Sequence, residues 1–257
     1  MMIQDIMMGM KKMITSVKNE KIKDWKKLHK RKERVNSKTF LIEGFHLIEE
    51  AITSNWDVIE IILENDIELP NSCKDIPYTI VSDNVFQHIA QTKAPQGIAA
   101  VVQIQPPKRI SGDNVLLVDA VQDPGNLGTI IRTADAAGFD AVVLGNDTVD
   151  LFNDKVIRAT QGSLFHVPIM EADLITKTSE LKEEGYRIWG AALENAYPFN
   201  EVTVDEKVAL IVGNEGAGIQ DELLRLVDTI VKIPIYGKAE SLNVSVASGI
   251  LMYYVKG

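Results

Sequence analysis

Three segments of this chain combine glycine, amide, carboxylate and guanidinium groups in patterns that could bind an anion or a flat ligand. They are DAVQDPGNLGTIIRTADAAG (119–138), VGNEGAGI (212–219) and IPIYGKAESLNVSVASGI (233–250). Each follows an apolar run that we predict as a strand. Because ligands bind beyond the carboxyl ends of the strands in an open parallel sheet, we expect the three segments to form one pocket.

The first segment begins as a turn and continues as an amphipathic helix. DPGN (123–126) is typical of a turn, and Gly128 precedes the predicted helix, which carries Arg132 on its first turns. A helix start offers unpaired N–H groups to an anion, and a guanidinium donates a planar fork of hydrogen bonds to phosphate. The simpler interpretation is a capped core helix with a surface arginine.

The second segment resembles a dinucleotide-binding loop only superficially. Its glycines are spaced G-x-x-G-x-G, whereas that loop requires G-x-G-x-x-G, and no acidic residue follows the next strand to bind a ribose. A nucleotide-binding oxidoreductase is therefore excluded. The glycines let the backbone approach a flat ligand, and Glu215 places a carboxylate on the loop tip. A plain tight turn is the alternative.

The third segment leads into a final helix whose start is unusually polar. Ser241 is the expected N-cap, and Asn243 and Ser245 add further hydrogen-bonding groups to the first turn. The side chains expected to pack inward are those of Leu242, Val246, Gly249 and Ile250. Because a cap explains one polar residue and three are present, we expect this helix start to line a ligand or a neighbouring loop.

The elements that hold these segments alternate between strands and helices. NVLLVD (114–119) is a continuous apolar run, as expected of a strand buried on both faces. The helix at 124–138 and the strand DAVVLG (140–145) complete one strand–helix–strand unit. KVALIVG (207–213) and IQDELLRLV (219–227) give a second strand and helix. This alternation predicts an α/β fold with a parallel sheet.

The dipeptide Pro106–Pro107 marks a break in the chain, because proline cannot continue a strand ladder. Before it, the pattern predicts a smaller α/β unit with strands at 40–44 and 58–64. The predicted organisation is a basic N-terminal arm or helix at 1–38, a small domain at 39–105, a linker at 106–112 and the parallel-sheet domain at 113–257.

Composition indicates a soluble globular protein of 257 residues, with 46% hydrophobic residues. One cysteine, Cys73, excludes a disulfide framework and fits a reducing cytosol, so we expect a cytoplasmic protein. Its apolar runs are much shorter than the roughly 20 residues of a membrane span. The amino terminus lacks the pattern of a secretory signal, and Met13 is an alternative start.

Charge is distributed very unevenly. The net charge is −9, but residues 1–38 hold 12 basic and 4 acidic residues, which gives +8. The remainder holds 27 − 12 = 15 basic and 36 − 4 = 32 acidic residues, which gives −17. A basic arm that binds a polyanion is one interpretation, and a solvated basic tail is the other.

Together, the three segments resemble the three motifs of the SpoU (TrmH-type) family of RNA 2′-O-ribose methyltransferases, in the SPOUT class. The resemblance covers residues 110–257, with the order and spacing of the motifs intact. Residues 39–104, beginning TFLIEGFHLIEEA, are similar to the L30e-like RNA substrate-binding domain that often precedes this catalytic domain.

The resemblance implies a deep trefoil knot, S-adenosyl-L-methionine as cofactor, and a homodimer through the knotted domain. It implies that Arg132 activates the ribose hydroxyl. We prefer a version in which Arg132 binds a phosphate and stabilises the developing alkoxide, because a guanidinium holds its proton at neutral pH. Asn126 and Glu215 would hold Arg132 in place. The other implied site residues are Ser241 and Asn243, which shape the pocket, and Gly213, Asn214, Gly218, Ile233 and Leu242, which bind the cofactor.

The expected function is methylation of a ribose 2′-hydroxyl, most of all in 23S ribosomal RNA. A tRNA methyltransferase and a non-catalytic RNA-binding factor in ribosome assembly are the alternatives. We expect no metal, because His46, His88 and His166 form no ligand-spaced cluster and Cys73 is expected to be inert.

Overall fold

A computed structural model describes residues 13–257 and divides the chain into two compact units that meet between Gln105 and Pro106. Residues 1–12 of the predicted basic arm lie outside the described part. Each unit is described by itself. No helix within residues 13–257 is long and apolar enough to cross a membrane.

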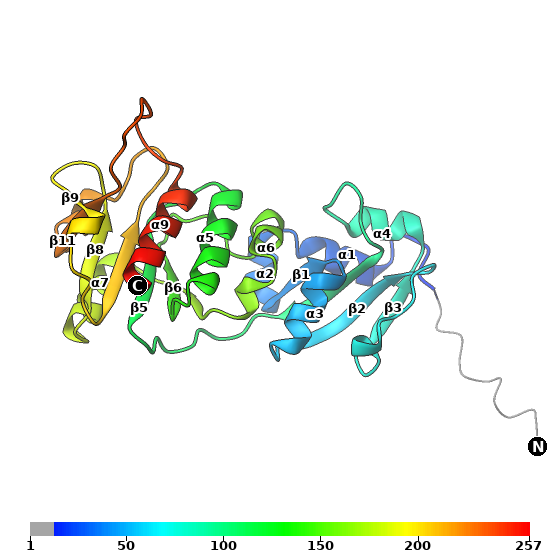
Figure 1. The fold of residues 1–257 in the computed structure, drawn as a ribbon. Coiled ribbons are helices and arrows are strands. Elements are labelled where there is room, and N and C mark those ends of the chain that lie inside the picture. The colour runs from blue at the N-terminus through cyan, green and yellow to red at the C-terminus, as the bar shows by residue number, and fades with distance from the viewer. Residues whose placement is uncertain (1–12) are drawn as a thin grey trace, which may run out of the picture. The chain divides into compact units, whose positions relative to one another are not determined.

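The first unit is a four-stranded sheet in the order β1-β4-β2-β3 (Figure 1). β4 runs antiparallel to β1 and β2, whereas β2 and β3 are parallel. The strands are β1 Thr39–Glu43, β2 Val58–Glu64, β3 Tyr78–Val81 and β4 Ile98–Gln103. The helices are α1 Glu20–Lys27, α2 Arg31–Ser37, α3 Phe45–Thr53 and α4 Asp83–Ile89.

The described part of the predicted basic arm or helix, residues 13–38, contains α1 and α2 of this unit. α1 is amphipathic, and its side chains Ile22 and Trp25 are buried in a core shared with Ile62 and Phe86. Lys21, Lys23 and Lys27 therefore lie on the outer face of a packed helix, where they form ion pairs with Glu60, Glu20 and Asp24.

The second unit contains a seven-stranded sheet in the order β7-β6-β5-β10-β8-β11-β9, with every pair parallel. The predicted parallel α/β sheet is confirmed. The strands are β5 Asn114–Val118, β6 Ala141–Leu144, β7 Ile169–Glu171, β8 Arg187–Ala191, β9 Tyr197–Pro198, β10 Val208–Val212 and β11 Thr229–Lys232. The helices are α5 Pro124–Ala136, α6 Asp154–Thr160, α7 Leu174–Glu183, α8 Asp221–Leu224 and α9 Val244–Lys256.

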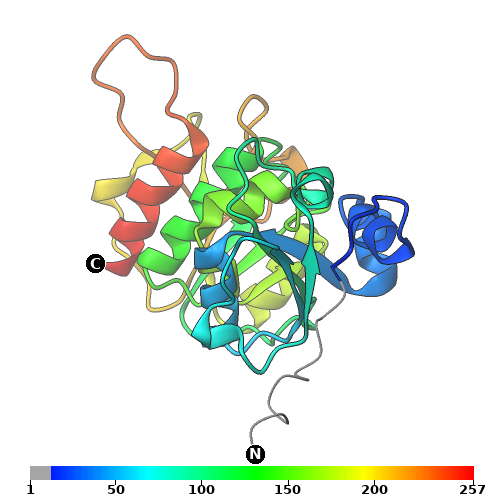
Figure 2. The same ribbon diagram turned by 90° about the vertical axis from the view of Figure 1, so that its right-hand side faces the viewer.

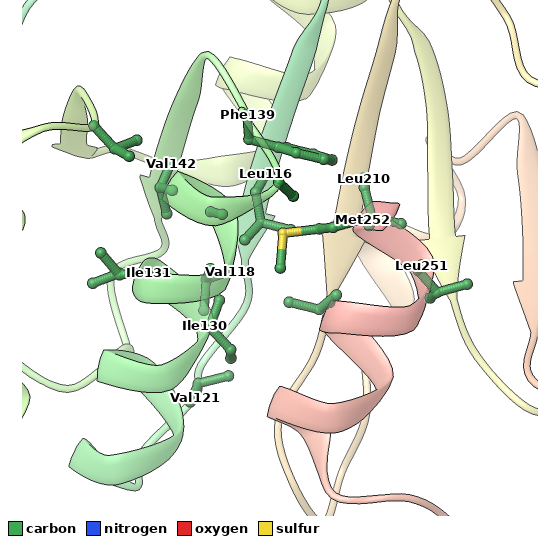
Figure 3. Close-up of a cluster of buried hydrophobic side chains, with 14 of the residues drawn as sticks. Leu116, Val118, Val121, Ile130, Ile131, Phe139, Val142, Leu210, Leu251 and Met252 are labelled. Atoms are coloured by element: carbon green, nitrogen blue, oxygen red, sulfur yellow. The ribbon is translucent and has the colours of Figure 1, made fainter. Parts of the chain in front are cut away.

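Both faces of this sheet are covered, which is why β6 and β10 are apolar at every position and β5 at every position after Asn114. Leu116 and Val118 of β5 point to a core shared with α5 and α9 (Figure 3), whereas Val115 and Leu117 point to a core shared with α7 and α8. Side chains alternate between the faces of a strand, so a strand without polar residues is one with a hydrophobic layer on each side.

The final helix packs beside α5, although more than 100 residues separate them (Figures 1 and 2). Its buried side chains are Ser245, Ser248, Leu251, Met252 and Val255. Small serines and Gly249, whose added Cβ would lie 3.4 Å from Cγ2 of Thr133, let the two helices approach closely.

Two expectations for this helix are wrong. Its N-cap is Asn243, whose Oδ1 accepts from the backbone N–H groups of Ser245 and Val246, and Ser241 lies outside the helix. Three of the four residues predicted to point inward are exposed, Leu242 by 37%, Val246 by 52% and Ile250 by 37%, whereas Gly249 packs against α5 as predicted. The helix is apolar on several sides, so periodicity alone could not select the buried face.

Candidate active site

The three segments follow three strands that end at the same edge of the sheet. Val118 of β5 pairs with Val212 of β10, so the loops that start at Asp119 and Gly213 are neighbours. β11 is separated from β10 by β8, and the packing of α9 on α5 brings the third loop back to the first. We name the three loops after their strands: the β5 loop (119–123), the β10 loop (213–220) and the β11 loop (233–243).

A buried carboxylate ties the β5 loop to the β10 loop. Asp119 is 2% exposed, and its two carboxylate oxygens accept from the backbone N–H and the side-chain amide of Gln220, at 2.8 and 2.7 Å. A second tie runs from Nδ2 of Asn214 to the carbonyl of Ala120, at 2.7 Å. Ala120 holds a left-handed conformation, with φ of 54°, which costs energy for a residue with a Cβ.

Glu215 receives hydrogen bonds from the start of α5. Its carboxylate accepts from the backbone N–H of Gln122 at 3.3 Å, from that of Asp123 at 3.2 Å, and from Nδ2 of Asn126 at 3.0 Å. Partial burial acts to raise the pKa of Glu215, but the donated hydrogen bonds outweigh it and hold that pKa below its ordinary value. Glu215 is therefore an ionised acceptor that positions the helix start.

One amide pair joins the first and third segments. Because ionised Glu215 only accepts, the amide nitrogen of Asn126 faces it, and Oδ1 of Asn126 faces the other way. Nδ2 of Asn243 donates to that oxygen at 2.9 Å, while Oδ1 of Asn243 caps α9. The result is a directed chain of hydrogen bonds, Asn243 to Asn126 to Glu215, that contains one side chain from each motif.

Arg132 does not take part in this chain. Its side chain is exposed, and it has no hydrogen bond or ion pair within residues 13–257. Six residues separate it from Asn126, which corresponds to about 9 Å along the helix axis. The expected support of Arg132 by Asn126 and Glu215 is thus absent from this structure. Ser241, exposed in the β11 loop, likewise has no hydrogen-bond partner in the described chain.

The residues expected to bind a cofactor lie on two of the loops. Gly213, Asn214 and Gly218 belong to the β10 loop, and Ile233 and Leu242 stand at the two ends of the β11 loop. Gly213 is buried because the loop closes on it: an added Cβ would lie 2.2 Å from the carbonyl carbon of Gly218. Nothing lies within 4 Å of a Cβ added to Gly218, so that side of the loop is open.

Sequence reasoning missed the residues that hold the loops together. Asp119 ends an apolar run, and a carboxylate in that place is a signal of a buried polar contact, but its partner Gln220 is 101 residues away. Gly128 lies within α5, not before it, and an added Cβ would lie 2.3 Å from Cβ of Ala159. Its role is the close packing of α5 and α6.

The histidines and the cysteine lie apart from this site. His166 is hydrogen-bonded to Asp135 at 2.9 Å near the far end of α5, and His46 and His88 belong to the first unit. Cys73 is buried, and burial raises the pKa of its thiol. Within residues 13–257 no group of three His, Cys, Asp or Glu side chains is arranged to hold a metal ion.

Both units of the chain match known protein families. Residues 113–253 match the SpoU rRNA methylase family, and residues 19–100 match the MRM3-like substrate-binding domain. A 23S rRNA (guanosine(2553)-2′-O)-methyltransferase, RlmP, of Bacillus subtilis is 50% identical, across 96% of this chain and all of the relative.

Two solved structures show how much of the fold is shared. An AdoMet-bound rRNA methyltransferase from Sinorhizobium meliloti has a TM-score of 0.86 and 30% identity, covering 95% of this chain and 97% of that one. A TrmH/SpoU tRNA-modifying enzyme from A. aeolicus has a TM-score of 0.51 and 34% identity, covering 58% of this chain and 76% of that one. This chain belongs to the SpoU rRNA methylase family.

Proposed function

We propose that this protein transfers a methyl group from S-adenosyl-L-methionine to a ribose 2′-hydroxyl of 23S ribosomal RNA. The observation that carries the proposal is the hydrogen-bonded chain of Asn243, Asn126 and Glu215, which unites the three motifs of the family in one place. The Bacillus subtilis relative, similar over its whole length, supports the same reaction and makes a guanosine the first nucleotide to test.

Ribosomal RNA is favoured over transfer RNA by the extent of the similarity. The rRNA methyltransferase structure matches 95% of this chain, whereas the tRNA-modifying structure matches 58%. The first unit matches a substrate-binding domain. Recognition of RNA commonly depends on unpaired loops and the 2′-hydroxyl, which a separate binding unit can help to present.

We expect the β10 and β11 loops to hold the cofactor. Gly218 leaves open space beside the β10 loop, and Ile233 and Leu242 offer partly exposed apolar side chains for an adenine ring. Gly213, Asn214, Gly218, Ile233 and Leu242 would hold it, largely through backbone groups. Bound there, S-adenosyl-L-methionine supplies a methyl group on a sulfonium, so the transfer needs neither a metal nor a covalent enzyme intermediate.

The chain's own residues orient the acceptor and stabilise charge. Arg132 binds an RNA phosphate and stabilises the alkoxide that develops as the 2′-hydroxyl loses its proton to phosphate or water. Asn126 is held by Glu215 on one side and Asn243 on the other, so its amide is fixed beside the pocket. Ser241 lines the pocket from the β11 loop.

A homodimer would complete the site. The exposed side of α9 presents Val246, Ile250 and Tyr253, the last 57% exposed, at the spacing of one helical stripe. Arg132 has no partner within the described chain, which suits a role in the site of a second subunit. The trefoil knot stays a prediction of the resemblance, as does a place in the cytoplasm.

The basic surface of the first unit is the proposed RNA contact outside the site. Lys30, Arg31 and Lys32 are exposed at the start of α2, and lysines and arginines that meet phosphates make RNA affinity depend on salt. Deleting residues 1–38 would also remove the buried Ile22 and Trp25, so replacing Lys30 and Lys32 by glutamine is the cleaner change.

The test is methyl transfer from radiolabelled S-adenosyl-L-methionine to unmodified 23S rRNA and to tRNA, followed by mapping of the modified nucleotide. We expect label in a 23S ribose. Label in tRNA alone would favour the tRNA alternative, and a protein that does not bind the cofactor in calorimetry would be the non-catalytic factor. R132K keeps the charge and loses the planar fork, so full turnover of that variant would contradict the role of Arg132.

A further inference from the structure

Tyr236 stands out among the exposed side chains of the described residues. It is 93% exposed, whereas Tyr197, the next most exposed of the large hydrophobic side chains, is 64% exposed. Neither its ring nor its hydroxyl has a partner within residues 13–257. An aromatic ring buries a large apolar area when it meets a partner, so full exposure leaves that contact available to a ligand.

The position of Tyr236 connects it to the proposed site. It lies in the β11 loop, which projects from the second unit between β11 and α9 (Figure 2). Ile233 begins this loop and Asn243 ends it. Three residues of extended chain span at most about 10 Å, so the backbone of Tyr236 stays within that distance of Ile233.

The residues after Tyr236 suit a nucleic-acid partner. Gly237 has no atom within 4 Å of an added Cβ, so the backbone beside the ring is open. Lys238 is exposed and has no ion pair in the described chain. An aromatic ring can stack on an unpaired base, and a cation two residues away can contact its phosphate, while the open backbone leaves room for both.

We propose that Tyr236 stacks on an unpaired base of the RNA next to the methylated ribose, and that Lys238 contacts the neighbouring phosphate. The proposal rests on the proposed function, which supplies RNA as the substrate. Stacking of this kind tolerates any base, because every base offers a flat face. Tyr236 therefore holds the RNA strand over the site, and the choice of nucleotide rests on other contacts.

The experiment compares Y236A, Y236F and Y236W with the wild type, using an unmodified 23S rRNA transcript and S-adenosylhomocysteine in a filter-binding assay. We expect Y236A to weaken RNA binding about tenfold or more, and Y236F and Y236W to bind within about twofold of wild type, because both keep a ring. Y197A is the matched control, since Tyr197 is exposed on β9 outside the three loops. K238Q should lower the slope of log affinity against log salt by about one unit.

Two further measurements separate this role from others. Calorimetric cofactor affinity and molecular mass by light scattering should be the same for Y236A and wild type. A Y236A variant with wild-type RNA affinity, with weaker cofactor binding, or with a changed oligomeric state would overturn the proposal, and the last would make Tyr236 a subunit contact. Wild-type protein that binds the transcript without methylating it contradicts the proposed function alone, and the binding comparison still tests Tyr236. A wild type without RNA affinity would overturn both.

Discussion

The β5 and β10 loops differ from the β11 loop in how firmly they are held. Gln220 donates twice to Asp119, Asn214 donates to Ala120, and Glu215 accepts from three groups at the start of α5. Within the described chain, the β11 loop is joined to them through one side-chain hydrogen bond, from Asn243 to Asn126. In this structure the β5 and β10 loops of the candidate site are therefore held by several hydrogen bonds and the β11 loop by one, so we expect the β11 loop to adjust more easily when a ligand binds.

This difference is useful for a transferase with a small cofactor and a large substrate. Because the β5 and β10 loops are already ordered, they lose little conformational entropy when the cofactor binds, which favours affinity. A loop that is anchored only at its ends can close on ligands of different size, at the cost of ordering it each time. Substitutions that loosen the β5 and β10 loops should therefore lower stability together with cofactor binding or methyl transfer, whereas loss of the hydrogen bond from Asn243 should lower kcat/KM with little loss of stability.

The largest expected effect comes from filling the closed side of the β10 loop. In G213A the new Cβ would lie 2.2 Å from the carbonyl carbon of Gly218, and backbone atoms cannot move aside as a flexible side chain can. We expect a loss of about 3 kcal/mol of unfolding free energy and at least tenfold weaker cofactor binding. Urea denaturation and calorimetry would measure the two.

G218A is the matched control for that substitution. Its added Cβ meets nothing within 4 Å, and its φ of +72° makes the cost of an alanine only about 1–2 kcal/mol. Equal losses of unfolding free energy and of cofactor affinity in the two variants would show that the close contact between Gly213 and Gly218 is not what holds the β10 loop in place.

Removing the charge of Glu215 should have the next largest effect. E215Q offers a weaker acceptor to Gln122, Asp123 and Asn126, and we expect a loss of about 1–2 kcal/mol together with weaker methyl transfer. The folded-state pKa of Glu215 lies below its ordinary value of 4.5, so its contribution to stability is present above pH 4.5 and is lost as the pH falls through the folded-state pKa.

The acid-side loss of stability should therefore be smaller in E215Q than in wild type. D228N is the control, because hydrogen bonds from the backbone of Ile188 and from Lys182 outweigh burial and hold the pKa of Asp228 below its ordinary value. Asp228 precedes β11 and lies away from the three loops. Both variants should flatten the acid limb of stability, and only E215Q should change activity.

The single link to the β11 loop can be cut without uncapping the helix. In N243D the carboxylate still accepts from the N–H groups of Ser245 and Val246, but it has no proton to donate to Oδ1 of Asn126. We expect stability within about 0.5 kcal/mol of wild type and roughly tenfold lower kcat/KM. N243A should lose about 1 kcal/mol as well, because it loses the cap.

Unchanged kcat/KM in N243D would mean that the β11 loop finds its place without this hydrogen bond. The loop that we regard as adjustable would then be fixed by backbone contacts, and the contrast between the loops would disappear.

The sequence predicts the strands of this protein better than it predicts the contacts of the site. VIEIILE at 58–64 forms a strand with those bounds, and the strand predicted for KVALIVG at 207–213 is observed at 208–212. Hydrophobic burial decides these elements locally, so the pattern contains the information. The family motifs identify the three loops for the same reason, since they are contiguous stretches.

Contacts between side chains that are distant in the sequence cannot be predicted from a local pattern in this way. Asp119 and Gln220 bind each other across 101 residues, and Arg132 stands apart from the Asn126 and Glu215 that were expected to hold it. The buried face of α9 could not be chosen, because Ser245 and Ser248 are buried while Val246 and Ile250 are exposed. A helix with apolar residues on two sides fits two packing partners, and its own sequence does not rank them.

The smallest expected effect tests strain in the β5 loop. Ala120 has a φ of 54°, a conformation that costs about 1–2 kcal/mol for an alanine and little for a glycine. Because glycine also makes the unfolded chain more flexible, by about 0.5–1 kcal/mol, A120G should gain only about 0.5–1 kcal/mol. The urea midpoint should rise with an unchanged m value.

A136G is the control for this substitution, because Ala136 is exposed in the last turn of α5 and a glycine there should cost up to about 1 kcal/mol. If A120G destabilises the protein as A136G does, the left-handed residue is not strained. If A120G gains stability but binds the cofactor less tightly, the hydrogen bonds of Asp119 and Asn214 do not fix the loop alone. The restricted backbone of Ala120 would then help to hold the β5 loop in place. The strain of its left-handed conformation would be the energetic cost of that rigidity.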